Sequence, residues 1–137
     1  MNFLLDTNAC IALINGEPAA VRNKFQRGAT AGDQFFVSSV AIFELWYGVF
    51  KSSRAEFNTN RVETFLSGAV SVLAFDDEDA RAAGFIRAGL EKRGKPIGVY
   101  DVLLAGQAIR HGLTLITADV SEFSRVKELQ WQDWSKG

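Results

Sequence analysis

Two acidic side chains of this sequence lie in surroundings where a negative charge is costly. Glu44 is the only charged residue of segment 40–50. Asp101 is likewise the only charged residue of segment 97–109. Both segments are expected to be helices, and 40–50 is apolar on all sides, which predicts that it is largely buried. A buried carboxylate without a partner is destabilising unless it takes up a proton or finds a cation. Because neither helix has Lys or Arg in its middle, a divalent cation is a good candidate.

Two further acids follow short apolar segments that we expect to be strands. Asp6 comes directly after 3–5, and Asp119 comes shortly after 113–117. In open parallel sheets, ligand sites form beyond the carboxyl ends of the strands. The four carboxylates are therefore predicted to meet at one edge of the sheet. Such an all-oxygen site suits Mg²⁺, with Mn²⁺ as a possible substitute.

Each of these carboxylates also has a purely structural interpretation. Asp6 could be only a helix N-cap, since Asp is among the favoured capping residues. Asp119 could be only a turn residue. Glu44 and Asp101 could form ion pairs with Arg side chains from elsewhere in the fold. The four together favour a metal site over four unrelated structural roles.

The elements that must position these acids alternate along the chain. Predicted strands cover 3–5, 35–37, 71–74 and 113–117, with a weaker one at 129–131. Predicted helices cover 9–14, 19–26, 40–50, 55–67, 78–93 and 99–110, with one helical turn at 121–125. This alternation predicts an α/β fold, in which helices cover both faces of a parallel sheet. We expect residues 1–137 to form a single domain.

The composition excludes several classes of protein. With 47% hydrophobic and 23% charged residues, the 137-residue chain is neither disordered nor fibrous. No segment has the roughly 18 uninterrupted apolar residues of a membrane span, and the first residues do not resemble a signal peptide. A single cysteine, Cys10, excludes an internal disulfide and a cysteine-rich zinc site, and we expect a cytoplasmic protein. The net charge of −1 argues against coating nucleic acid by charge alone, but it allows a nuclease whose acids and bases cancel.

The remaining reactive side chains favour structural roles. The acidic run 76–79 is typical of a solvated helix start. His111, the only histidine, is expected in a last helical turn near free carbonyl groups, and Cys10 in the core. Without a second histidine or a serine elbow, a hydrolase triad cannot be assembled.

Several motifs, in order, resemble those of a known family. They are Leu4-Leu5-Asp6-Thr7-Asn8, Ser38-Ser39-Val40 with Glu44-Leu45 and Gly48, Pro96 to Asp101 with Leu104-Ala105, Leu115 to Asp119, and Glu122 to Val126. The series is similar to PIN-domain ribonucleases, and in particular to the VapC toxins of bacterial toxin–antitoxin pairs. The resemblance covers nearly the whole chain. One departure is Asp119, where many relatives have Asn.

The resemblance implies a site and a function. Asp6, Glu44, Asp101 and Asp119 would be the catalytic, metal-binding set. Thr7 and Thr117 would orient it. The chain would be a single PIN domain and a Mg²⁺-dependent endoribonuclease that cuts structured RNA, often tRNA and sometimes ribosomal RNA. A VapB-type antitoxin would inhibit it, a homodimer is expected, and DNA would be contacted only through the antitoxin.

The predicted reaction is hydrolysis of an RNA phosphodiester by a water that the metal activates, which requires no Ser, Cys or His nucleophile. The candidates for phosphate contacts are Lys51, Arg54, Arg87, Arg93 and Lys95, although these could also be solvated surface. The aromatic side chains of the Glu44 helix could be core, pack in a homodimer or form a groove for the antitoxin; they are Trp46, Tyr47 and Phe50.

Two alternatives remain open. A phosphotransfer protein would also place an Asp after its first strand, but a phosphatase would need a second Asp where Asn8 stands. A receiver domain would need paired acids near the first strand and a late Lys. A non-catalytic scaffold of the same fold is disfavoured because all four carboxylates are retained.

Overall fold

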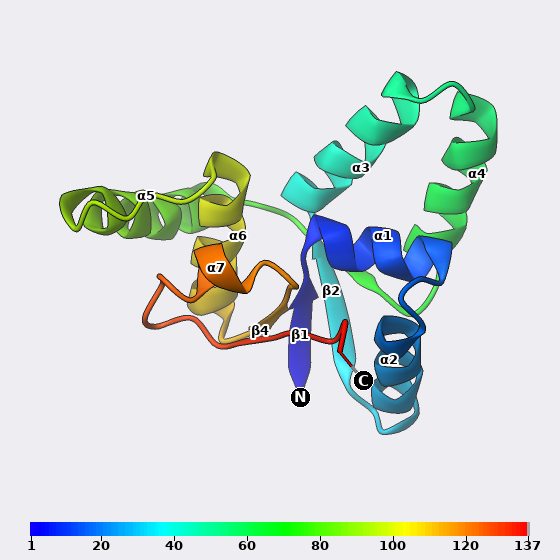
Figure 1. Cartoon of the computed structure of the whole chain (residues 1–137), viewed down its shortest axis with the longest axis horizontal. Coiled ribbons are helices and arrows are strands. Elements are labelled where there is room, and N and C mark those ends of the chain that lie inside the picture. Colours follow the sequence, from blue (N-terminus) through cyan, green and yellow to red (C-terminus); the bar gives the residue numbers. More distant parts are fainter. Residues whose placement is uncertain (137) are drawn as a thin grey trace.

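The structure is a computed structural model that describes residues 1–136. A sheet of five parallel strands, in the order β3-β2-β1-β4-β5, forms its centre. The strands are β1 (Asn2–Leu5), β2 (Gln34–Ser38), β3 (Ser71–Leu73), β4 (Thr114–Ile116) and β5 (Trp131–Gln132). The helices are α1 (Thr7–Asn15), α2 (Ala19–Thr30), α3 (Ser39–Lys51), α4 (Ala55–Leu66), α5 (Asp77–Lys92), α6 (Val99–His111) and α7 (Val120–Phe123). Figure 1 shows helices on both sides of the sheet, so the predicted α/β architecture is confirmed.

The central strand β1 divides the hydrophobic core into two parts, because successive side chains of a strand point to opposite faces. Phe3 and Leu5 pack in one buried cluster with side chains of α1 to α4. Leu4 packs in a second cluster with side chains of α5, α6 and α7. In the sheet, Leu4 lies in register with Phe36 of β2 and Leu115 of β4. Both faces of β1 are therefore covered by helices.

The expectation that α3 is largely buried is wrong. Its side chains at Phe43, Tyr47 and Phe50 are 55%, 60% and 72% exposed. The helix extends beyond the sheet beside α4 (Figure 1), so only the stripe that includes Leu45 and Val49 reaches the core. Although α3 is apolar on all sides, part of its surface is therefore exposed rather than buried. No helix within residues 1–136 has the length and apolar character to cross a membrane.

The acidic run 76–79 at the start of α5 was expected to be solvated, but Asp79 is fully buried. Its Oδ2 accepts hydrogen bonds from the backbone N–H of Asp76, at 3.0 Å, and from Nε2 of Gln107, at 3.1 Å. Its Oδ1 lies 2.9 Å from a guanidinium nitrogen of Arg110 and 3.2 Å from Nε2 of His111. One carboxylate thus fastens the start of α5 to the end of α6, where the sequence predicted only free carbonyl groups as partners of His111.

Replacement of Asp79 with Ala should lower the free energy of unfolding by about 3 kcal/mol, because it leaves the buried Gln107 amide and the Arg110 guanidinium without their shared acceptor. Asp77→Ala, two residues earlier on an exposed position, should change it by less than about 1 kcal/mol. Denaturant unfolding followed by circular dichroism measures both values. Equal losses in the two variants would contradict a role for the buried network.

Candidate active site

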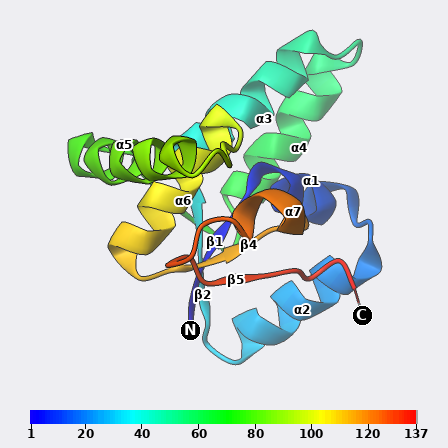
Figure 2. The ribbon, with the colours of Figure 1, turned by 60° about the vertical axis from the view of Figure 1, so that its left-hand side comes forward.

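The ends of two neighbouring strands place the first two carboxylates. Asp6 follows β1 and caps α1, with its Oδ1 accepting a hydrogen bond from the backbone N–H of Ala9 at 2.7 Å. Asp119 follows β4 and caps α7, where its Oδ1 accepts from the Ser121 hydroxyl at 3.1 Å and from the N–H of Glu122 at 3.4 Å. Because β1 and β4 are adjacent and parallel, both acids lie at the same sheet edge, from which α1 and α7 start (Figure 2).

Thr117 connects these two acids. Its hydroxyl accepts a hydrogen bond from the backbone N–H of Asp119 at 2.9 Å, and it lies close enough to Asp6 to lower the pKa of that carboxyl. The side chain of Thr117 is buried and directly follows β4. That Thr117 orients the Asp6 carboxylate stays a prediction.

Glu44 reaches the same edge from α3. Its Oε1 accepts a hydrogen bond from the hydroxyl of Thr7 at 2.6 Å, which fixes the half-buried side chain beside the start of α1. The Glu44 charge also raises the pKa of Asp6, so the two carboxylates are close enough to repel one another. The structure thus brings Asp6 and Glu44 together through Thr7.

Asp101 and Glu122 complete the group of acids. Asp101 lies in the first turn of α6, as predicted, and Glu122 lies on α7. Carboxylate oxygens of Asp101, Asp119 and Glu122 all lie within 4.8 Å of one another. Glu122 Oε2 also accepts a hydrogen bond from the backbone N–H of Gly98 at 3.0 Å, which joins α7 to the start of α6.

Glu122 was not among the site residues predicted from the sequence. It appeared only as part of the last motif, within what was expected to be one helical turn. Its spacing from Asp119 was the available signal, because residues three apart on a helical turn lie on the same side. With Glu122 included, five carboxylates lie at this sheet edge. Asp101, Asp119 and Glu122 form a close group, and Asp6 and Glu44 lie beside it, where the charges of Glu44 and Asp119 raise the pKa of Asp6.

The proton balance of the site reflects this crowding. Burial, the hydrogen bond to Glu122 and the charges of Glu122, Asp119 and Asp6 raise the pKa of Asp101 to about 7. The same hydrogen bond, together with that from Gly98, lowers the pKa of Glu122. Below pH 7, Asp101 is therefore the member of the pair that takes up a proton first. Burial is also the main cause that raises the pKa of Asp6, partly offset by the hydrogen bonds from Thr117 and Ala9.

The donor set fits a divalent cation. Among the described residues, no Lys, Arg or His nitrogen lies within 4.0 Å of any of these five carboxylates, so the Arg pairing considered for Glu44 and Asp101 does not occur. Carboxylate oxygens are the ligands that Mg²⁺ and Mn²⁺ prefer. The arrangement therefore has the negative charge and the chemistry to hold such an ion beside a phosphate.

The candidate phosphate-binding residues fall into two groups. Arg93 and Arg125 flank the loop before α6, with Arg93 donating to the Arg125 carbonyl at 3.4 Å and Arg125 to the Pro96 carbonyl at 2.8 Å. Lys95 belongs to this same loop. Arg87, by contrast, forms an exposed pair with Glu91 on α5. Lys51 and Arg54 lie over aromatic rings at the far end of α3, away from the acids.

Comparisons with known proteins agree with the motifs and the fold. The PIN domain family matches residues 3–129. The chain is 40% identical to the tRNA(fMet)-specific endonuclease VapC of Shigella flexneri, over 98% of this chain and 99% of that protein. It is 35% identical to Ribonuclease VapC2 of Rickettsia felis, over 99% of this chain and 100% of that protein.

Solved structures give the same result. In the crystal structure of VapBC2 from Rickettsia felis bound to a promoter DNA fragment, one chain matches with a TM-score of 0.90 and 34% identity, over 98% of this chain and 99% of its own. A chain of the DNA-bound VapBC from Salmonella typhimurium matches with a TM-score of 0.89 and 37% identity, over 98% of both chains. The resemblance drawn from the motifs is confirmed: this chain belongs to the PIN-domain family and, within it, to the VapC ribonucleases.

Proposed function

We propose that this chain is a metal-dependent endoribonuclease toxin that hydrolyses phosphodiester bonds in structured RNA, with Mg²⁺ as the cofactor and tRNA as the favoured substrate. The observation that carries the proposal is the set of five carboxylates at one sheet edge without a Lys, Arg or His partner within residues 1–136. The tRNA substrate is favoured because the Shigella flexneri relative is a tRNA(fMet)-specific endonuclease. Because tRNA is found in the cytoplasm, we propose that the protein acts there.

Each acid has a distinct part in the proposed reaction. A divalent ion bound there would polarise the scissile phosphate and lower the pKa of a bound water. Asp6, held by Thr117 and the Ala9 N–H, provides a ligand oxygen of fixed position. Asp101 and Asp119 would provide further ligand oxygens, with Glu122 next to them. Glu44, oriented by Thr7, completes the negative side of the site.

The RNA backbone is proposed to run past the loop before α6. Arg93, Lys95 and Arg125 lie around this loop, and Gly98 at its end is bound to Glu122. Cations beside an acidic metal site attract the phosphates that the acids alone would repel. The hydrogen bonds of Arg93 and Arg125 to backbone carbonyls set the positions of their guanidinium groups.

An antitoxin of the VapB type is the proposed inhibitor, since the similar solved chains come from VapBC complexes. We place an antitoxin segment in a groove of about 250 Å³ between α1, α3 and α4. Its apolar lining includes Ile11, Leu45, Gly48 and Val62. A homodimer through the exposed aromatic side chains of α3, such as Tyr47, is proposed as well.

Replacement of Asp6 with Asn should lower the rate of RNA cleavage by more than about 100-fold, because even groups that only orient metal ligands are worth about 10–100-fold. Purified protein, separated from its antitoxin, is incubated with total cellular RNA in Mg²⁺ or EDTA. The wild type should give discrete fragments in Mg²⁺ alone, and Asp77→Asn on exposed α5 should behave like the wild type. Cleavage that persists in EDTA or in Asp6→Asn would contradict the proposed mechanism.

Cation binding should depend on pH because the ion must displace the proton of Asp101. The pKa of Asp101 is about 7, so Mn²⁺ affinity should fall about tenfold for each pH unit below 7 and level off above it. In Glu122→Gln the carboxylate that raises this pKa is lost, and the midpoint should move to lower pH. Titration calorimetry from pH 5 to 8 measures both. A flat profile for the wild type would disprove this coupling.

Replacement of Gly48 with Leu should fill the antitoxin groove. A Cβ at Gly48 meets no atom within 4 Å, and Leu favours a helix more than Gly does, so the variant should fold. We expect antitoxin affinity to fall at least about tenfold, as for loss of one well-packed contact, while RNA cleavage is retained. The matched control is Gly84→Leu on α5, which is equally open. Equal affinity in both variants, measured by calorimetry, would exclude this groove.

A further inference from the structure

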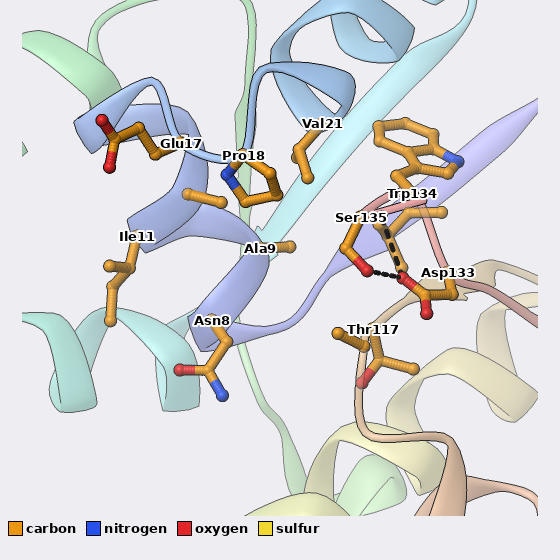
Figure 3. Close-up of a pocket in the computed structure, with 13 residues that line it drawn as sticks. Asn8, Ala9, Ile11, Glu17, Pro18, Val21, Thr117, Asp133, Trp134 and Ser135 are labelled. Atoms are coloured by element: carbon orange, nitrogen blue, oxygen red, sulfur yellow. Dashed lines mark hydrogen bonds between the residues drawn. The ribbon is translucent and has the colours of Figure 1, made fainter. Parts of the chain in front are cut away.

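A second cavity, of about 220 Å³, lies on the other side of α1 between the start of α2 and the C-terminal segment (Figure 3). Its walls are mostly apolar and include Ala9, Ala12, Pro18, Val21, Ile116 and Trp134. Polar side chains also line it, namely Asn8, Glu17, Thr117, Asp133 and Ser135. The volume is below the roughly 300–1,000 Å³ of sites for drug-sized ligands, so one small ring system is the appropriate size of occupant.

The cavity adjoins the acidic site through shared and neighbouring residues. Thr117 lines the cavity, and its hydroxyl accepts a hydrogen bond from the backbone N–H of Asp119. Asn8 lies two residues after Asp6, and Ala118 directly precedes Asp119. An RNA strand with one phosphate at the carboxylates would have a neighbouring nucleotide within reach of this cavity.

The charge of the lining selects a base rather than a phosphate. Glu17 and Asp133 are the charged residues of the lining, and among its described members there is no Lys or Arg. The charges of Lys24 and Lys136 reach Asp133 from outside the lining. Within the lining, a phosphate would meet negative side chains, whereas a neutral base with N–H donors would find an apolar space and acidic acceptors. Proteins that recognise RNA sequence commonly bind unstacked bases in this way, through hydrogen bonds to the Watson–Crick edge.

Asp133 is held in place to act as such an acceptor. Its Oδ1 accepts hydrogen bonds from the backbone N–H of Ser135 at 2.9 Å and from the Ser135 hydroxyl at 2.6 Å, as the dashed lines in Figure 3 indicate. These bonds lower the pKa of Asp133, so it remains a carboxylate, and Oδ2 keeps both lone pairs. The wall beside it is rigid, since Trp134 is 6% exposed and packs edge-on against Phe3 and Phe35.

We propose that this cavity binds the base of the nucleotide next to the scissile phosphate and that Asp133 selects guanine there. Guanine presents two adjacent N–H donors on its Watson–Crick edge. The Oδ2 atom of Asp133 can accept both, because Oδ1 is already bonded to Ser135, whereas the other bases do not present two neighbouring donor groups. The inference rests on the proposed ribonuclease function, because it assigns the substrate preference of that same site.

The test uses antitoxin-free protein and an RNA pool with random nucleotides around a fixed stem, and the cleaved ends are sequenced. The wild type should prefer guanine at one position beside the cut. In Asp133→Asn this preference should fall at least about fivefold, since one good contact between a side chain and a base edge discriminates by that factor or more. Val21→Phe, which fills the cavity, should abolish it. Asp77→Asn, the same change at an exposed site on α5, should leave it unaltered.

The outcomes separate this inference from the function on which it depends. A wild type that cuts no RNA in Mg²⁺ contradicts the ribonuclease itself. A wild type that cuts without a guanine preference, or a preference that survives in Asp133→Asn, overturns the base-binding cavity alone. The base-binding cavity is also overturned if Asp133→Asn and Val21→Phe are no longer inhibited by the antitoxin but keep the RNA preference of the wild type, because the cavity would then bind protein. Thermal unfolding and Mn²⁺ binding check whether Val21→Phe is folded. If Val21→Phe is unfolded, the guanine preference of Asp133→Asn alone decides whether the cavity binds a base.

Discussion

Repulsion between carboxylates at the ends of β1 and β4 is the constraint around which this part of the fold is arranged. Burial alone raises the pKa of Asp6, and neighbouring acids raise it further. The structure offsets this with donors that cannot move away: the Ala9 N–H at the start of α1, the Thr117 hydroxyl, and the Gly98 N–H that binds Glu122. Helix N-termini supply most of these donors, where the helix dipole also favours negative charge. A cation would relieve the remaining repulsion.

Much of this arrangement could be predicted from the sequence because its signals are local. The order of strands and helices follows from apolar runs and capping residues, and the strand-end positions of Asp6 and Asp119 follow from that order. Glu44 and Asp101 were identifiable as single charges in apolar helices. These four side chains do meet at one edge, although their roles as ligands stay a prediction until metal binding is measured.

What could not be predicted depends on contacts between segments distant in sequence. Asp79 looks like any acid at a helix start, and its burial follows from Arg110 and Gln107 of α6 approaching it. Glu122 lies in a four-residue helix, and it becomes part of the site only because Gly98 anchors it beside Asp101. The exposure of α3 arises from the direction in which the helix leaves the sheet. The hydrophobic pattern of the helix alone does not determine that direction.

The net charge of −1 conceals a strong separation of charge. Five acids lie at one sheet edge, three of them in close contact. Arg93 and Arg125 are held at the adjoining loop by backbone carbonyls rather than by ion pairs with these acids. This separation leaves both the carboxylates and the Arg side chains free to bind ligands, because an Arg paired with Asp101 would occupy the position that a metal ion needs. The carbonyl bonds therefore have a chemical consequence: they let cations stand close enough to attract a phosphate without neutralising the carboxylates that would act on it.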